Sequence, residues 1–373
     1  MKIFKYSLLS LATVLFLLCI FLYSLYGGGE KWEFSIPKPL LTSDKLELVA
    51  DFNFPPGNIG VSKENRVFIT IHPESKPETL KVVEIVDGKP IAFPDLDSQK
   101  KLYSHPQGVR IDYKNRVCTI DHGDNGFQNP RLVCVSLITN KAEIDYRFPR
   151  ESAPILSYLQ DFANSPDSRY YYIADVNFFG KKPALVVYDS ETKTSHRFLE
   201  NHPSMKPENW KIQAHNGPME RLGGLITLKA GVDSIATDAK GEWVYYGPMN
   251  HRKLFRIPAK VLQNFSGTDA EVATAIEEYS DKILSDGIIL DASNNIYLTD
   301  VEHQSIGLID PNRNLKTLVV SPKLRWPDGL AISADGTYLY IADSDIPNVA
   351  LMSKSHIQSK APYQVFRVKL PKN

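Results

Sequence analysis

One short pattern occurs six times along the 373-residue chain. Its clearest copies are SDGIILDASNNIYLTD (285–300) and PDGLAISADGTYLYIAD (327–343). In each copy a small or polar residue, here called the anchor, lies five positions before a Ser or Asp. A turn follows, and then a strand rich in Val, Ile and Tyr. The six anchors are Gly57, Gln107, Gln160, Asp233, Asp286 and Asp328.

The spacing of the anchors constrains the fold class. Four of the five intervals are 42 to 53 residues long, and the third is 73. Repeats of about 40–50 residues that hold several strands are typical of propeller blades. A linear solenoid needs polar capping repeats, which the sequence does not show, and a β-sandwich does not explain six matching copies. The sequence therefore predicts an all-β, six-bladed β-propeller over 45–373, closed by strands at 46–52 and 363–370.

The long third interval indicates an insertion. Residues 200–224 are polar and aromatic and contain Pro and Gly, which predicts a long loop on one face of the disc. Loops of that length in compact domains are often functional. A shorter amphipathic segment, 268–281, predicts a helix between blades.

The N-terminus has a different composition. Residues 6–26 contain no charge, proline or glycine, and Lys2 and Lys5 precede them. Such a segment is long enough to cross about 30 Å of hydrocarbon as a helix. The lysines predict a cytoplasmic N-terminus and an exported body, periplasmic or extracellular. We expect a retained anchor at 1–29 and a linker at 30–44; a cleaved signal peptide ending near the glycines at 27–29 is the alternative.

Cysteine usage and charge bear on the compartment and on the partners. Cys118 and Cys134 lie on adjacent expected strands, so they either form a cross-strand disulfide or are small buried apolar residues. Lys plus Arg equals Asp plus Glu, at 43 each, which gives no basis for nucleic-acid binding. The N-terminal segment is the only part expected to contact a membrane.

The anchors should converge, because the innermost strand of each blade borders the central channel of a propeller. Asp233, Asp286 and Asp328 then bring three carboxylates to the channel mouth, where they repel one another unless a cation or protons intervene. Oxygen ligands favour Ca²⁺ or another hard divalent cation. In the alternative, these aspartates only support turns through backbone hydrogen bonds. The aspartates that close the copies, Asp121, Asp175, Asp300 and Asp343, are interpreted as turn residues.

Candidate ligand-binding residues come from the same loops and anchors. Gln107 and Gln160 add amide groups at the mouth, and His215, His251 and His303 lie beside expected strands where channel-face loops could carry them. A solvated loop position is the alternative for each histidine. The sequence contains no G-x-S-x-G motif, phosphate loop or zinc-spaced cysteine pair, so catalytic residues are not assigned.

Three blocks of the chain resemble the major royal jelly/Yellow protein family, and are most similar to its bacterial members related to dopachrome tautomerase. The blocks are 231–258, 285–306 and 326–344, in this order. The resemblance covers roughly 45–370. It implies a six-bladed propeller in an exported protein, and does not imply one reaction.

A more distant similarity is to the regucalcin/gluconolactonase family. Those lactonases hold a divalent metal with a Glu, two Asn and an Asp at the anchor positions. Here the Glu position is Gly57, the Asn positions are Gln160 and Asp233, and the Asp position is Asp286. Only Asp286 matches, and Asp328 is an additional carboxylate.

The sequence supports three hypotheses. The first is an exported propeller that binds a small molecule, with or without a divalent metal, at the channel mouth. The second is a metal-dependent lactonase- or tautomerase-like enzyme at the same site. The third is a platform for protein interactions. Bound metal, an apolar channel pocket or a large exposed apolar patch would distinguish them.

Overall fold

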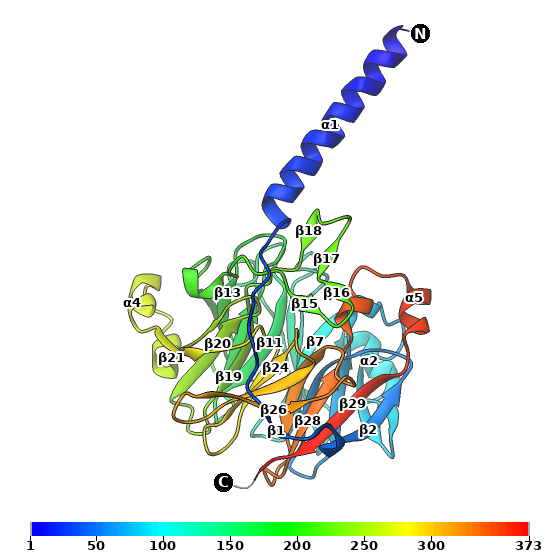
Figure 1. The fold of residues 1–373 in the computed structure, drawn as a ribbon. Helices are drawn as coiled ribbons and strands as arrows, with labels where there is room; N and C mark the ends of the chain where they lie inside the picture. The colour runs from blue at the N-terminus through cyan, green and yellow to red at the C-terminus, as the bar shows by residue number, and fades with distance from the viewer. Residues whose placement is uncertain (1, 372–373) are drawn as a thin grey trace.

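The computed structural model describes residues 2–371, which form a six-bladed β-propeller preceded by one long helix (Figure 1). Every blade contains four antiparallel strands, and the first of them borders the central channel. Blade 1 consists of β3 (Pro56–Val61), β4 (Val67–Ile71), β5 (Val82–Val86) and β6 (Lys89–Ala92). Blade 2 consists of β7 (Pro106–Ile111), β8 (Arg116–Asp121), β9 (Arg131–Ser136) and β10 (Ala142–Arg147). Blade 3 consists of β11 (Leu159–Asn164), β12 (Tyr170–Asp175), β13 (Ala184–Asp189) and β14 (Thr194–Phe198).

The remaining blades follow the same plan. Blade 4 consists of β19 (Val232–Thr237), β20 (Trp243–Pro248), β21 (Lys253–Pro258) and β22 (Glu277–Asp281). Blade 5 consists of β23 (Ile288–Leu290), β24 (Ile296–Asp300), β25 (Ser305–Ile309) and β26 (Leu315–Val320). Blade 6 consists of β27 (Pro327–Ile332), β28 (Tyr338–Asp343), β29 (Tyr363–Lys369) and β2 (Leu46–Phe52). The six-bladed fold predicted from the repeat is confirmed.

The ring closes through the two ends of the chain. β2 pairs antiparallel with β29, with Leu48 opposite Phe366 and Phe52 opposite Tyr363. β2 thus forms the outer strand of the blade that the C-terminal segment builds, and the two segments close the ring as the sequence predicted. Part of the expected linker is also ordered, because β1 (Pro39–Leu41) adds to blade 5 as a parallel neighbour of β26.

Side chains that alternate along the strands pack between neighbouring blades and form the core. One cluster joins blades 3 and 4 through Tyr172, Val187 and Tyr246, which are all fully buried. Because the strands are covered on both faces, they read as nearly continuous apolar runs such as ALVVY (184–188).

The two faces of the disc carry different connections. Loops that leave the second strand of a blade, or lead to the first strand of the next blade, lie on the side here called the mouth face; they include 122–130, 148–158, 176–183, 199–231 and 344–362. The short turns within the hairpins, such as 112–115 and 137–141, lie on the opposite face.

The insertion predicted at 200–224 lies on the mouth face. It contains a 3-10 turn at Pro203–Met205 and two small hairpins, β15 (Gln213–Ala214) with β16 (Gly217–Pro218) and β17 (Glu220–Arg221) with β18 (Ile226–Thr227). The segment is therefore more structured than a simple loop.

Within residues 2–371, four short α-helices lie in connections between strands: α2 (Leu96–Leu102), α3 (Ala259–Leu262), α4 (Asp269–Thr274) and α5 (Lys354–Ser359). α4 begins with a capping box between Thr268 and Glu271. The helix expected over 268–281 is therefore confirmed only in its first half, because 277–281 form β22, the outer strand of blade 4.

The N-terminal helix α1 (Lys2–Tyr26) projects away from the propeller beside β17 and β18 (Figure 1). Its segment Leu9–Tyr26 has a mean hydropathy of 2.2 and no side chain buried against the body, so it is long and apolar enough to span a membrane. Length and composition fit a membrane anchor and a signal sequence equally.

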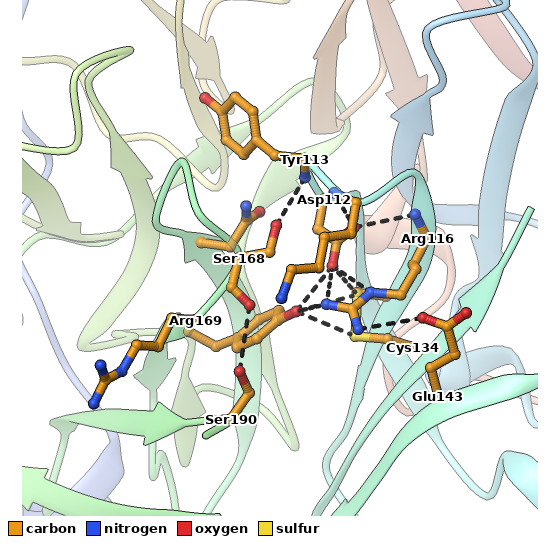
Figure 2. Close-up of polar contacts among 12 residues, drawn as sticks. Asp112, Tyr113, Arg116, Cys134, Glu143, Ser168, Arg169 and Ser190 are labelled. Carbon is orange, nitrogen blue, oxygen red and sulfur yellow. Dashed lines mark hydrogen bonds and ion pairs between the residues drawn. A yellow bond between two sulfur atoms is a disulfide. The ribbon is translucent and has the colours of Figure 1, made fainter. Parts of the chain in front are cut away.

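Cys118 and Cys134 form a disulfide between the directly paired strands β8 and β9. A buried ion pair lies beside it, in which Arg116 Nη2 is 2.6 Å from Asp112 Oδ2 (Figure 2). The disulfide alternative from the sequence is the one that the structure shows. The side chain of Tyr171 donates a hydrogen bond of 2.9 Å to the same carboxylate.

Candidate functional site

The anchors occupy equivalent places in the six blades. In blades 1, 2, 3, 4 and 6 the pairing register of the first strand shifts immediately after the residue that precedes the anchor. A bulge of this kind re-aims a side chain at the rim of a sheet. The repeated small or polar residue therefore marks the start of each inner strand.

A cavity of about 360 Å³ opens at the mouth face over three of the anchors, Gln160, Asp233 and Asp286. The walls are largely apolar and aromatic. They include Tyr158, Phe178, Met219, Leu228, Met249 and Trp326. An apolar chamber with a few converging polar groups is the usual form of a small-molecule site.

Asp233 lies at the floor of this cavity, and its side chain is almost completely buried. Neither of its carboxylate oxygens accepts a hydrogen bond from any residue that the structure describes. Burial, together with the nearby charges of Asp286 and Asp328, raises the pKa of Asp233 well above its usual value. Asp233 is thus a buried carboxyl group whose oxygens are available to bind a proton or a cation.

Asp286 is held in place by two donors. Trp326 Nε1 donates to its Oδ2 at 2.7 Å, and Gln160 Nε2 donates to its Oδ1 at 3.2 Å. Burial raises the pKa of Asp286 to about 7, although both hydrogen bonds act in the opposite direction. This carboxyl group therefore changes its charge near neutral pH.

Asp328 is buried on the blade 6 side of the channel and does not line the cavity itself. Its Oδ2 is 3.7 Å from His72 Nε2 and accepts no hydrogen bond from the described residues. Burial and the charge of Asp286 raise the pKa of Asp328. Gln107 Nε2 lies 3.3 Å from the same His72 nitrogen, and the amide oxygen Gln107 Oε1 is unpaired within the described chain.

A further carboxylate lies one residue beyond the blade 3 anchor. Asp161 accepts hydrogen bonds from Arg110 Nη2 at 2.5 Å and from Asn58 Nδ2 at 3.2 Å. Burial raises the pKa of Asp161, while Arg110 opposes the shift. Asp161 in turn contributes to the raised pKa values of the three anchor aspartates. Asp161 lies outside the repeated anchor positions, so no sequence pattern indicated this role.

The aromatic wall of the cavity is formed partly by residues at one fixed position in the repeat, which the sequence reasoning did not identify. His105, Tyr158 and Trp326 each lie two residues before an anchor, and all three line the cavity. The rings of His122 and Tyr158 stack with centroids 4.1 Å apart. Burial raises the pKa of Tyr158 and lowers that of His122, so both side chains are neutral at pH 7. Aromatic residues at a constant offset from the anchors would have indicated this wall.

The three loop histidines lie outside the cavity lining. His215 Nε2 is 2.9 Å from Asp345 Oδ1, and His303 Nδ1 is 3.0 Å from Asp300. His251 Nδ1 accepts a hydrogen bond from the Lys253 backbone at 3.0 Å. Contact of these side chains with a ligand therefore stays a prediction that the geometry does not favour. Of the two glutamines, Gln160 reaches the cavity, whereas Gln107 lies behind His72.

The closing aspartates bind backbone amides, as their interpretation as turn residues implies. Three of them, Asp121, Asp175 and Asp343, connect the end of the second strand to the segment that precedes the first strand, whereas Asp300 binds only amides that follow it. The donors are the amides of Ser104 and His105 to Asp121, Tyr158 and Asn177 to Asp175, Glu302 and His303 to Asp300, and Trp326 to Asp343.

Among the described residues, the oxygens of Asp233, Asp286 and Asp328 do not all lie within 4.8 Å of one another, so the three carboxylates as placed do not surround a single ion. Asp233, Asp328 and Gln107 all have unpaired buried oxygens, and such oxygens are the ligands that Ca²⁺ and Mg²⁺ prefer. A second cluster brings Asp112 close to Cys118 and Cys134. Its sulfurs form the disulfide and its carboxylate binds Arg116, so it offers no comparable site.

Comparisons with known proteins agree with the fold. The family model described as "Major royal jelly protein" matches residues 106–370. No curated protein sequence matches the chain significantly. A gluconolactonase from Xanthomonas campestris has a similar structure, with a TM-score of 0.58 and 10% identity over 93% of this chain and 98% of that one. The calcium-binding protein regucalcin from Agrobacterium tumefaciens gives a TM-score of 0.54 and 12% identity over 86% and 93%. At such identities the likeness concerns the fold alone.

Proposed function

Because this chain belongs to the major royal jelly protein family, we propose that it is an exported propeller that binds a small molecule, together with a divalent cation, in the channel-mouth cavity. The observation that carries the proposal is Asp233. Its two carboxylate oxygens are buried and unpaired within the described chain, and they lie at the floor of an apolar chamber. A buried polar group without a partner is costly, and a ligand that satisfies it recovers that cost.

The cation would be held by Asp233, Asp286 and Asp328, after a shift of their side chains that brings their oxygens within reach of one ion. The charge of Asp286 raises the pKa of both Asp233 and Asp328, so these carboxyl groups repel one another when they are ionised. A divalent cation removes this repulsion and replaces the protons. Calcium is our first choice because it accepts irregular sets of oxygen ligands.

The organic ligand would fill the space above the cation. The walls contributed by Phe178, Met219 and Trp326 favour an apolar or aromatic body. Gln160 and the carboxyl groups at the floor favour a carbonyl or hydroxyl group at the buried end. Methionine side chains adapt their shape to different ligands, which suits a carrier.

A metal-dependent enzyme at the same site, lactonase- or tautomerase-like, is the second candidate. Its support is the fold shared with a gluconolactonase and the buried carboxyl groups at the channel, of which one that does not hold the cation would move the proton. A bound cation would polarise a ligand carbonyl. Asp161 would not take part, because Arg110 and Asn58 occupy its oxygens.

Calcium titration of the full-length protein in detergent tests the cation site. The melting temperature should rise with calcium, because a ligand that binds only the folded state stabilises it by about 2.7 kcal/mol at a hundredfold excess over Kd. Asp286→Ala should abolish this rise. Asp121→Asn is the matched control, because Asp121 binds backbone amides and lies outside the cavity lining.

The outcomes separate clearly. A wild-type melting temperature that calcium, magnesium and manganese all leave unchanged would exclude the cation. A calcium effect that survives Asp286→Ala would place the cation elsewhere. For the organic ligand, the probe anilinonaphthalene sulfonate should fluoresce on binding to the wild type. Met219→Trp, which fills the cavity, should reduce that fluorescence, whereas Ile138→Ser on the opposite face should not.

A further inference from the structure

The C-terminal end of α1 is attached to the wall of the cavity. Tyr26 Oη donates a hydrogen bond of 2.7 Å to the Phe179 carbonyl, and its ring lies 5.8 Å from that of Phe178. Phe178 and Phe179 both line the cavity. Because the apolar segment ends at Tyr26, the boundary of a membrane that holds α1 lies at the rim of the site.

The segment that follows α1 is held against the propeller by contacts along its length. Lys229 Nζ donates to the Gly27 carbonyl at 2.8 Å, and Glu30 forms a β-bridge with Trp210 in the insertion. Trp32 then lies 6.3 Å from the ring of Trp210. The connection is therefore a docked strand, and the propeller does not hang from a free tether.

Exposed apolar side chains also occur elsewhere on the propeller, as at Ile91, Tyr113 and Ile138, and five lie on the loops of the mouth face. These five lie on different connections and are 42 to 67% exposed. They are Phe127, Ile155, Phe179, Leu222 and Leu351. Two of these residues, Phe179 and Leu351, also line the cavity, so the apolar surface is continuous with the chamber. Large side chains of this kind, gathered around a pocket, indicate an interaction surface.

The foot of α1 has the chemistry of a membrane interface. Lys181 Nζ lies 4.4 Å from the ring centre of Tyr26 and 4.3 Å from that of Phe178. Lys229 Nζ also donates a hydrogen bond to the carbonyl of Gly27, the residue that follows the helix. Aromatic rings beside lysines are enriched at the level of lipid headgroups, where each side chain has an apolar body and a polar end.

From these observations we propose that the mouth face of the propeller rests on the bilayer that holds α1, with the five apolar loop residues inserted into its headgroup region. The partner is a lipid surface because the apolar helix ends on this face and the connection to it is docked. The cavity then opens toward lipid. The proposal requires α1 to remain attached, and it does not depend on the cation or on the identity of a ligand.

Spin labels measure the depth of single positions in full-length protein reconstituted into lipid nanodiscs. Cys19 is free and exposed, whereas the other two cysteines form the disulfide. Labelled Cys19 therefore reports whether α1 lies in hydrocarbon. In a Cys19→Ser background, Leu222→Cys and Leu351→Cys report on the mouth face. Ile138→Cys, at an exposed turn of the opposite face, is the matched control.

The quantity measured is the ratio of collision rates with oxygen, which concentrates in lipid, and with a water-soluble nickel complex. The ratio should be highest at 19, intermediate at 222 and 351, and lowest at 138. A ratio at both 222 and 351 as low as at 138 overturns the proposal, as does a solvent-exposed label at 19. Low collision rates with both reagents at 222 and 351 would instead show a protein partner or a second copy on this face, and would also overturn it.

Discussion

Trp326 Nε1 donates a 2.7 Å hydrogen bond to Asp286 Oδ2, so a side chain that precedes blade 6 orients the carboxyl group that begins blade 5. Trp326 is fully buried. The bond leaves the Asp286 side chain directed at the cavity floor and lowers its pKa against the effect of burial. The aromatic wall and the carboxyl cluster are therefore one connected unit.

The substitution Trp326→Phe tests this connection. It removes the donor and keeps most of the aromatic volume, so the pKa of Asp286 should rise above about 7. Calcium binding requires the ionised carboxylate, and the midpoint of its pH curve should move to higher pH. Trp243→Phe is the control, because Trp243 packs on Arg256 away from the cavity. Equal pH midpoints in the two variants would contradict the role of the bond.

The apo protein should lose stability as pH rises through neutrality. The pKa of Asp286 is about 7 in the folded state and about 3.8 otherwise. Between pH 3.8 and pH 7 the folded protein binds more protons at Asp286 than the unfolded chain does. The contribution of the protonated Asp286 to the free energy of unfolding is therefore fully present below pH 3.8 and is lost as pH rises through 7. Asp286→Asn removes the loss. In the presence of a chelator, the variant should gain about 2–4 kcal/mol relative to wild type between pH 5 and pH 8, measured by denaturant unfolding. A difference that does not change with pH would rule out this titration.

Most of the fold could be predicted because the same strand–turn–strand pattern occurs six times in the sequence. Each anchor precedes a Ser or Asp at a fixed distance, and this local pattern sets the start of the inner strand and its turn. The strands that close the ring were also predictable, because 46–52 and 363–370 lie outside the six copies and have a strand composition. The parallel pairing of β1 with β26 was not, because no local pattern specifies a partner that lies far away in sequence.

The site was predicted less completely, for physical reasons. The anchor carboxylates stood out because the repeat places them, but their partners are chosen by three-dimensional packing. Asp161 acquires its role from Arg110, a residue of the neighbouring blade. The loop histidines were selected by residue type and by their place beside expected strands, which do not determine where a side chain points. His251 and His303 bond to residues two or three positions away, and His215 bonds to the distant Asp345.

Closure of the ring should depend on the last strand. β29 lies between β28 and β2, so removing 363–373 exposes the edges of both neighbours. We expect a protein that does not fold to a protease-resistant core. Removal of 371–373 alone, which follow β29, is the control and should leave the melting temperature close to that of wild type. A truncated chain that melts as wild type does would show that closure is unimportant.

The N-terminal helix should remain on the mature protein. Tyr26 and Gly27 make specific contacts with the body, which removal of the segment would abolish. Full-length protein should therefore stay with membranes after an alkaline wash, and its size should not change on export. A mature N-terminus near Gly29 would identify the helix as a cleaved signal instead.

The Arg110–Asp161 pair should behave as a coupled unit. Its atoms Arg110 Nη2 and Asp161 Oδ2 are 2.5 Å apart, and both side chains are largely buried. Arg110→Met alone leaves Asp161 buried with only Asn58 as a side-chain donor, and such a loss costs about 3–5 kcal/mol of unfolding free energy. In Arg110→Met with Asp161→Asn the unpaired charge is absent, so the double variant should be more stable than Arg110→Met. Part of the loss should remain, because Arg110 also donates to the carbonyls of Phe162 and Leu330. Denaturant unfolding of all four proteins gives the coupling energy, and additive effects of the two substitutions would show that the pair is not coupled.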